Sequence, residues 1–491
     1  MNENILSLEP KALWKNFRDL TLIPRPSKHE KKVTDFLLDF GKKHCDEAFI
    51  DNVGNVVFRK KSTISMANRK GILLQAHCDM VPQKDDNKVH NFETDPIETI
   101  VTDGFVMANK TTLGADDGMG VAAIMTIMQD ENLQHGPLEA LITIDEETGL
   151  TGAFGLEPNL LKSDVLLNLD SEEDNIFYIG CAGGITANIE ANLTFEDVYD
   201  GFTPYIINVD GFLGGHSGSD IHKNRPNAIK ILFRLFMEAE NFDIKICNFE
   251  GGSLSNAIPR SCKAQILVDS SKISEFESFV TNFNKTIYRE YSNFDPNGKI
   301  SFIKQDSLPS KCLSDDSSKR IIFLVNSIVS GVFTMSADIP GLVETSNNLA
   351  IVKIENSKAL ITTLLRSSVD SQSKYLCNII KCQVEYCGAK ISFSGEYPGW
   401  KPNTQSEIME IMKSIYKENF GEEPIITAIH AGLECGLILG KYPKLDVISF
   451  GPNLFNVHTP TEKVEIKSVQ KIMKLLYEVI KNAPFKGGLI A

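Results

Sequence analysis

Short apolar runs alternate with stretches of helical periodicity over the first 185 residues of the chain. Runs of four to eight apolar residues favour buried strands, whereas apolar positions three and four apart favour a helix. The predicted elements are a helical region over 7–45 broken at Ile23–Pro26, strands over 48–58, 70–77, 137–143 and 165–169, and a helix over 118–129. Such alternation is typical of a doubly wound α/β fold, with a mostly parallel sheet between layers of helices.

The middle of the chain differs, because its apolar positions alternate along longer strands such as Ala264–Asp269 and Leu360–Leu365. It also contains a weak internal repeat. Asp269-Ser270-Ser271, an amphipathic stretch and Lys299–Phe302 resemble Arg366-Ser367-Ser368, a second amphipathic stretch and Lys390–Phe393. The offsets are 368 − 271 = 97 and 390 − 299 = 91 positions. We interpret this region as an α+β domain with a duplicated β-α-β unit.

The alternation of short apolar runs with helical periodicity returns after Tyr397. There the pattern predicts a helix over 405–419, a strand over 445–450 and a helix over 468–481. A chain of 491 residues exceeds one comfortable hydrophobic core. We therefore predict one domain built from two segments, 1–185 and 398–491, with a second domain inserted at 186–397.

Composition and charge narrow the class of protein. A net charge of −14 argues against a nucleic-acid surface, which needs a basic patch. The first 17 residues lack the basic and apolar regions of a signal peptide, and no apolar stretch reaches the roughly 20 residues of a membrane helix. The ten cysteines include no C-x-x-C pair. They are expected to be reduced thiols in a cytoplasmic protein without a membrane partner.

Acids and histidines gather where predicted elements begin or end. The positions are His77, Asp116, the pair Glu146–Glu147, Asp170 and His458. Each has a structural alternative: Asp116 or Asp117 could cap the next helix, Asp170 could start a turn, the Glu146 run could be a solvated loop and His458 a surface residue. Ligands bind outside the carboxyl ends of strands in open α/β sheets, so the set as a whole favours a site.

Packed carboxylates repel one another unless cations neutralise them. Two imidazoles and three carboxylates suit two divalent metals roughly 3.5–4 Å apart, bridged by one carboxylate. At a strand end, one of Glu146 and Glu147 can bind metal while the other stays free as a general base.

The chain resembles the aminoacyl-histidine dipeptidase family, also called Xaa-His or cytosol non-specific dipeptidases, within a di-zinc group that includes carnosinases and glutamate carboxypeptidases. The matching stretches are QAHCDMVPQK, TTLGADDGMGVAA, IDEETGLTGAFGL, LLNLDSEE, GGHSGSDIH, GGSLSNAIPR, HAGLECGL and FGPNLFNVHTPTEKV. They span residues 75–464, nearly the whole chain.

The resemblance implies a role for each residue of the candidate site. Asp116 would bridge two zinc ions, His77 and Asp170 would complete one site, and Glu147 and His458 the other. Asp79 would support His77, and Glu146 would be the general base. The resemblance also implies a cis peptide bond between Asp116 and Asp117. Cys78, which lies between His77 and Asp79, is not expected to be a nucleophile.

In the inserted domain, the resemblance implies that His216 stabilises the oxyanion of the tetrahedral intermediate, from its own or a partner subunit. From local sequence alone, His216 would be a turn histidine, Asn256 a turn residue and Arg366 an exposed strand residue. The resemblance makes Asn256 and Arg366 substrate-binding residues, since arginine suits a terminal carboxylate. It assigns no firm role to His222, His430 or Glu434.

The resulting expectation is a homodimeric, zinc-dependent dipeptidase that cleaves Xaa-His dipeptides with wide tolerance. Manganese or cobalt would tolerate similar ligands. The alternatives are an N-acyl amino acid deacylase or amidohydrolase of the same di-zinc group, and a non-catalytic binding protein that keeps the fold. A binding protein would be expected to lose ligands or Glu146, and none is lost.

Overall fold

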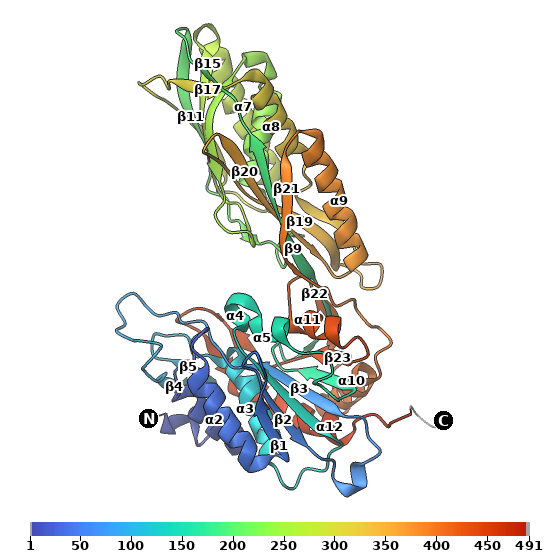
Figure 1. Ribbon diagram of the computed structural model, residues 1–491. Helices are drawn as coiled ribbons and strands as arrows, with labels where there is room; N and C mark the ends of the chain where they lie inside the picture. Colours follow the sequence, from blue (N-terminus) through green and yellow to red (C-terminus); the bar gives the residue numbers. More distant parts are fainter. Residues whose placement is uncertain (1, 488–491) are drawn as a thin grey trace. The chain divides into compact units, whose positions relative to one another are not determined.

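A computed structural model describes residues 2–487, which form two compact units (Figure 1). Within the described residues, unit 1 comprises 2–180, 402–428 and 433–487. Unit 2 comprises Cys181–Lys401 and Ile429–Gly432. The two ends of the chain therefore build one unit together, and the middle of the chain builds the other.

Unit 1 is organised around an eight-stranded sheet. Its order is β1 (Glu47–Ile50), β2 (Val56–Lys60), β6 (Leu138–Thr143), β3 (Ile72–His77), β7 (Val165–Asn168), β23 (Asp446–Ser449), β8 (Ile176–Cys181) and β22 (Ile425–Ile429). The four strands β6, β3, β7 and β23 are parallel, whereas β1, β2 and β8 pair antiparallel at the flanks. The predicted parallel α/β sheet is confirmed, with antiparallel strands added at its flanks.

The α-helices of unit 1 pack against this sheet or against one another. They are α1 (Lys11–Thr21), α2 (Lys31–His44), α3 (Ala115–Gln129), α4 (Glu146–Gly149), α5 (Thr151–Gly155), α10 (Glu407–Phe420), α11 (Glu434–Lys441) and α12 (Ile466–Lys481). Of these, α2, α3 and α10 contact the strands of the sheet directly. Helix α3 contacts both α1 and β3, and it is buried along almost its whole length. Its sequence explains this, because a helix that is apolar on every side can only be stable inside a core.

A smaller antiparallel sheet joins the end of the chain to an early hairpin. Its order is β24 (Leu454–Phe455), β25 (Lys463–Glu465), β5 (Phe105–Ala108) and β4 (Thr99–Thr102). The segment between β24 and β25 contains His458.

The single strand predicted over 48–58 is wrong, because the chain there forms an antiparallel hairpin of β1 and β2. Asp51 makes the turn: its Oδ1 accepts hydrogen bonds from the backbone N–H groups of Val53, Gly54 and Asn55, each 2.9 Å long. Gly54 has φ of 120°, which suits glycine. The Asp-x-x-Gly-Asn pattern was a turn signal inside an otherwise apolar run.

Unit 2 is built on a nine-stranded antiparallel sheet. Its order is β16 (Lys299–Lys304), β11 (Phe202–Asp210), β15 (Cys262–Asp269), β13 (Lys245–Gly251), β19 (Val343–Glu355), β20 (Lys358–Ser367), β9 (Gly183–Asn192) and β21 (Lys390–Tyr397), with β18 (Gly331–Met335) also paired to β19. Four helices pack on it and share one apolar core: α6 (Ala228–Glu238), α7 (Ile273–Tyr291), α8 (Asp315–Ser327) and α9 (Asp370–Tyr386).

The predicted duplication is present, and the sheet order makes it palindromic. Strand β11 pairs with both β15 and β16, and α7 connects those two strands. Strand β9 pairs in the same way with β20 and β21, which α9 connects. The first repeat is inserted into the second, between β9 and α8. A two-stranded stem of β10 (Phe195–Asp197) and β17 (Lys311–Leu313) closes the insertion point.

None of the ten cysteines, all of which lie within residues 2–487, forms a disulfide. No helix in that range combines the length and apolar character that crossing a membrane would require.

Candidate metal centre

The carboxyl ends of the parallel strands in unit 1 bring together the residues predicted to bind metal. His77 is the last residue of β3, and Asp170 follows β7 by two positions. Glu146 and Glu147 form the first turn of α4, directly after β6. Because β3, β6 and β7 pair in parallel register, these side chains emerge at one edge of the sheet.

Asp116, at the start of α3, lies between two histidines that come from opposite ends of the chain. Its Oδ1 is 3.1 Å from His77 Nε2, and its Oδ2 is 3.1 Å from His458 Nε2. His77 Nε2 is also 3.5 Å from Asp170 Oδ1, and His458 Nε2 is 3.0 Å from Glu147 Oε2. The five side chains thus form two groups that share one carboxylate, each with its possible ligand atoms within 4.8 Å of one another.

The charges in these groups are poorly compensated by protein alone. Burial raises the pKa of Asp170 to about 7, and contacts with Asp116 and Glu147 raise the pKa of His458 to about 11. Glu147 Oε1 is buried without a hydrogen-bond partner. Nitrogen and oxygen donors around such uncompensated carboxylates fit divalent cations, which would supply the missing positive charge.

Asp79 connects His77 to the turn that carries the two glutamates. Its Oδ1 lies 3.4 Å from His77 Nδ1 and accepts the backbone N–H of Glu146 at 3.1 Å. Its Oδ2 accepts the backbone N–H of Glu147 at 3.2 Å and the hydroxyl of Ser27 at 2.8 Å. Burial opposes ionisation, but the adjacent His77 ring and the hydrogen bonds from Ser27 and Glu146 outweigh it and lower the pKa of Asp79 to about 2. This carboxylate therefore fixes the histidine ring and both glutamate backbones together.

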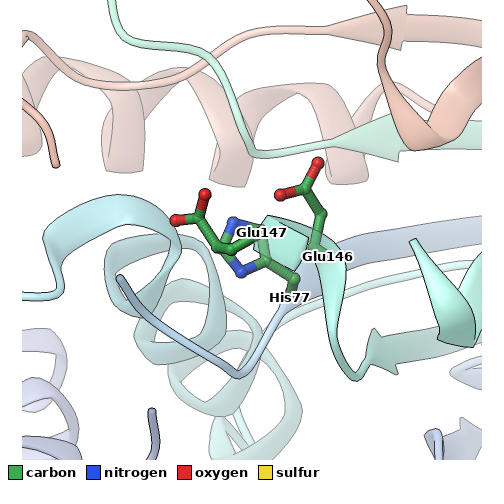
Figure 2. A group of neighbouring side chains, drawn as sticks. All are labelled: His77, Glu146 and Glu147. Atoms are coloured by element: carbon green, nitrogen blue, oxygen red, sulfur yellow. The ribbon is translucent and has the colours of Figure 1, made fainter. Parts of the chain in front are cut away.

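Glu146 and Glu147 direct their carboxylates to different sides of the His77 ring (Figure 2). The three residues also form a group whose possible ligand atoms lie within 4.8 Å of one another. Burial, helped by the carboxylates of Asp170, Glu434 and Glu147, raises the pKa of Glu146 well above its usual range. Unlike Glu147, Glu146 has no contact with His458 or Asp116 among the ion pairs of the site.

The Asp116–Asp117 peptide bond is cis, as the resemblance implied. Of the two residues considered as helix caps, Asp117 makes the capping contact: its Oδ1 accepts the backbone N–H of Gly120 at 3.0 Å.

Cys78 lies between His77 and Asp79 in the sequence. Burial raises the pKa of its thiol well above the usual value, so this sulfur is protonated at neutral pH.

In unit 2, His216 and Arg366 face each other. His216 lies in the short strand β12 (Gly215–His216), which pairs with β14 (Ala257–Ile258), and Arg366 lies in β20. His216 Nδ1 accepts the backbone N–H of Ser219 at 3.1 Å, so in the neutral ring the proton is on Nε2. That Nε2 lies 3.5 Å from Arg366 Nη2. Two donors therefore lie side by side.

Arg366 is held from two sides. Its Nε donates to Ser217 Oγ at 3.2 Å, and its Nη1 donates to the Tyr397 hydroxyl at 3.0 Å. Burial, then the Arg366 charge, lowers the pKa of His216, which favours the neutral ring. The backbone carbonyl oxygen of Asn256 accepts the backbone N–H of Ser217 at 2.8 Å, next to this cluster.

His430 and Glu434, to which the sequence assigned no firm role, are both buried. In unit 2, His430 Nε2 lies 2.7 Å from Ser346 Oγ, and burial lowers the pKa of His430 to about 3. In unit 1, Glu434 accepts hydrogen bonds from Gln75 and Thr143 at 2.6 and 2.7 Å, and burial raises its pKa to about 8. His222 is exposed.

Sequence reasoning missed Arg25, Ser27, Tyr397 and Glu462, although each contacts a candidate residue or the backbone beside one. Glu462 could have been identified from the sequence, because it lies in the stretch HTPTEKV that begins with His458. The other three lie in segments where local sequence carries no signal of a site.

Comparison with known proteins places this arrangement in a known group. The model of peptidase family M20/M25/M40 matches residues 73–482. The cytosol non-specific dipeptidase of Escherichia coli K12 is 39% identical over 480 residues, covering 98% of this chain and 99% of that protein. The crystal structure of aminoacylhistidine dipeptidase from Vibrio alginolyticus superposes with a TM-score of 0.92 at 38% identity, covering 98% and 99% of the two chains.

A tripeptidase structure from Staphylococcus aureus shares the fold, with a TM-score of 0.56 at 17% identity over 97% of this chain and 99% of that one. The family model covers most of the chain, and the relative from Escherichia coli covers nearly all of it. This chain therefore belongs to peptidase family M20/M25/M40.

Proposed function

We propose that this protein is a metal-dependent dipeptidase that hydrolyses the peptide bond of dipeptides, characteristically Xaa-His, with two divalent ions bound per chain. The observation that carries the proposal is the position of Asp116, whose two carboxylate oxygens each lie 3.1 Å from a different histidine. The names of the two similar proteins, a non-specific dipeptidase and an aminoacylhistidine dipeptidase, support the substrate class.

One ion would be held by His77, Asp116 and Asp170, and the other by Asp116, Glu147 and His458, with zinc as the expected metal and manganese or cobalt as alternatives. Bound there, the ions would polarise the scissile carbonyl and acidify a water molecule. Asp79 would hold the ring of His77 through Nδ1, an outer contact typical of metal-binding histidines.

Glu146 is the proposed general base. Positive charge in the site would favour its ionised form and so offset the burial that raises its pKa. The carboxylate could then take a proton from the attacking water and pass it to the leaving amine. Its backbone N–H bond to Asp79 fixes the start of α4, from which the side chain projects.

In unit 2, the proposed substrate contacts are His216, Arg366 and Asn256. The Nε2–H of His216 would stabilise the oxyanion of the tetrahedral intermediate. The guanidinium of Arg366 would bind the terminal carboxylate of the dipeptide, with Asn256 beside it. His216 and Arg366 face each other within a single chain, so the pair itself needs no second copy.

Removing the metal should abolish hydrolysis. We expect protein stripped with a strong chelator to show no activity on a dipeptide panel, and two equivalents of zinc, manganese or cobalt per chain to restore it. Stoichiometry measured by elemental analysis checks the two-ion site. Full activity of the metal-free protein would contradict the proposal.

The same panel separates the proposal from its nearest alternative. A deacylase or amidohydrolase would cleave N-acyl amino acids and leave dipeptides intact. Hydrolysis of Xaa-His and other dipeptides, with N-acyl amino acids unchanged, is the expected result. Cytoplasmic location and homodimerisation through unit 2 stay predictions, the second to be checked by light scattering of the purified protein.

Arg366→Lys should separate carboxylate binding from chemistry. A lysine cannot form the two parallel hydrogen bonds of a guanidinium, so we expect KM for dipeptides to rise about 10- to 100-fold. The corresponding dipeptide amides, which lack the carboxylate, should be almost unaffected. Arg234→Lys is a matched control, because Arg234 pairs with Glu238 and Glu290 outside this cluster. Equal loss for dipeptides and amides would contradict the assignment.

A further inference from the structure

Glu462 is a buried carboxylate that binds four consecutive backbone amides. Its Oε2 accepts the N–H groups of Leu113 and Gly114 at 2.8 and 3.0 Å, and its Oε1 accepts those of Ala115 and Asp116 at 2.7 and 3.3 Å. The residue is 2% exposed, so water does not compete for these bonds. The chain thus presents four donors to one side chain, directly before the Asp116 carboxylate.

The backbone conformation explains how four amides can point the same way. Gly114 has φ of 69°, in the left-handed region that suits glycine. A Cβ at this position would lie 2.6 Å from Arg25 Nη2 and 2.8 Å from Met80 Sδ, so a larger residue would displace its neighbours. Glycine therefore allows the turn that gathers these N–H groups.

Arg25 holds the same loop from its carbonyl side. Its Nη2 donates to the carbonyl oxygen of Gly114 at 2.5 Å, and its Nη1 donates to the carbonyl oxygens of Cys78 and Asp79 at 3.0 and 3.1 Å. Arg25 is also buried, at 2% exposure. The loop before Asp116 is thereby tied to the segment that follows His77.

Glu462 also belongs to the segment that carries His458. It lies four residues further along the chain, and its backbone N–H donates to the carbonyl oxygen of Thr459 at 3.1 Å. One short segment therefore supplies the histidine that contacts Asp116 Oδ2 and the carboxylate that holds the Asp116 backbone.

We infer that Glu462 is a positioning residue for Asp116, which sets the shared carboxylate at the distance that both metal ions need. This inference rests on the proposed two-metal function. A carboxylate fits the task because it offers acceptor sites on both oxygens and no donor. In glutamine, the side-chain nitrogen is a donor and would face two of the amide N–H groups.

The test is Glu462→Gln in the full-length protein, with zinc affinity measured by competition against a chromophoric chelator. Loss of an outer contact to a metal ligand typically weakens metal binding 10- to 100-fold. We expect a loss of about that size for both zinc equivalents, because Asp116 belongs to both groups. His458→Ala should weaken mainly one equivalent, since His458 belongs to one group only.

Glu465→Gln is the matched control. Glu465 lies three residues away in β25 and its carboxylate accepts one bond, from Asn453 Nδ2 at 2.8 Å. Its zinc affinity should equal that of the wild type. If Glu462→Gln folds poorly, Glu462→Asp provides the milder test, because the shorter side chain keeps the charge but cannot span all four amides.

A purely structural role would give a different result. The substitution Glu462→Gln would then lower the thermal stability of the metal-free and the zinc-loaded protein by the same amount, and zinc affinity would be unchanged. That result would overturn the inference about Glu462 but not the two-metal function. Wild-type protein that binds no zinc would overturn the two-metal function and this inference together. About 10- to 100-fold weaker binding of both equivalents in Glu462→Gln, beside unchanged binding in Glu465→Gln, supports the inference.

Discussion

Glu146→Gln should lower kcat by about 10²- to 10⁴-fold, the range typical of a lost general acid–base residue. Glutamine keeps the size of the side chain but cannot take a proton from water. The backbone N–H of Glu146, not its side chain, donates the hydrogen bond to Asp79. The start of α4 should therefore be the same as in the wild type. The measurement is steady-state hydrolysis of a dipeptide by the zinc-loaded variant.

Metal content distinguishes a base from a ligand at this position. Glu146 lies within 4.8 Å of possible ligand atoms on His77 and Glu147, so it could in principle bind metal itself. We expect Glu146→Gln to retain two ions per chain, whereas the neighbouring Glu147→Gln should lose one. A Glu146→Gln protein with wild-type kcat would contradict the proposed mechanism. Loss of an ion from that variant would instead identify Glu146 as a metal ligand.

His216→Ala should reduce kcat by about 10²- to 10³-fold, as expected when one oxyanion donor is removed. Metal content should not change, because His216 belongs to unit 2 and the proposed ligands belong to unit 1. The proton on Nε2 is essential to this role. The backbone N–H groups that bind Nδ1 favour that tautomer in the neutral ring.

His222→Ala is the matched control for this substitution. His222 lies six residues further along the chain and is exposed, and it makes no contact with Arg366 among the hydrogen bonds of the cluster. We expect its kinetics to match the wild type. If His216→Ala turned over dipeptides at the wild-type rate, the oxyanion role would have to pass to another donor.

The strand ends were predictable because their signal is local. A short apolar run followed by polar residues marks the end of a buried strand; His77 is the last residue of one such strand, and Asp170 lies two positions beyond another. The pairing of Asp116 with His458 depends on residues 342 positions apart, which no local pattern encodes. Their roles as ligands came from the family resemblance and stay predictions.

Contacts made through the backbone were the hardest to anticipate. Glu462 binds amide groups that every non-proline residue possesses, so its partners have no signature in the sequence. The hairpin of β1 and β2 was missed for the opposite reason. Its turn signal at Asp51 was present, but it lay inside an apolar stretch that suggested one continuous strand.

The nesting of one repeat inside the other has a consequence for synthesis of the chain. Strand β9 finds its partner β20 only after a long delay, since Ile189 pairs with Ile361, which is 361 − 189 = 172 residues later. At roughly 5–20 residues per second, the ribosome needs about 10–30 s to produce that partner. The inserted repeat, including β11, β15 and β16, emerges within this interval and can pair first. During translation, β9 is thus an unpaired strand edge that is open to mispairing until β20 has been made.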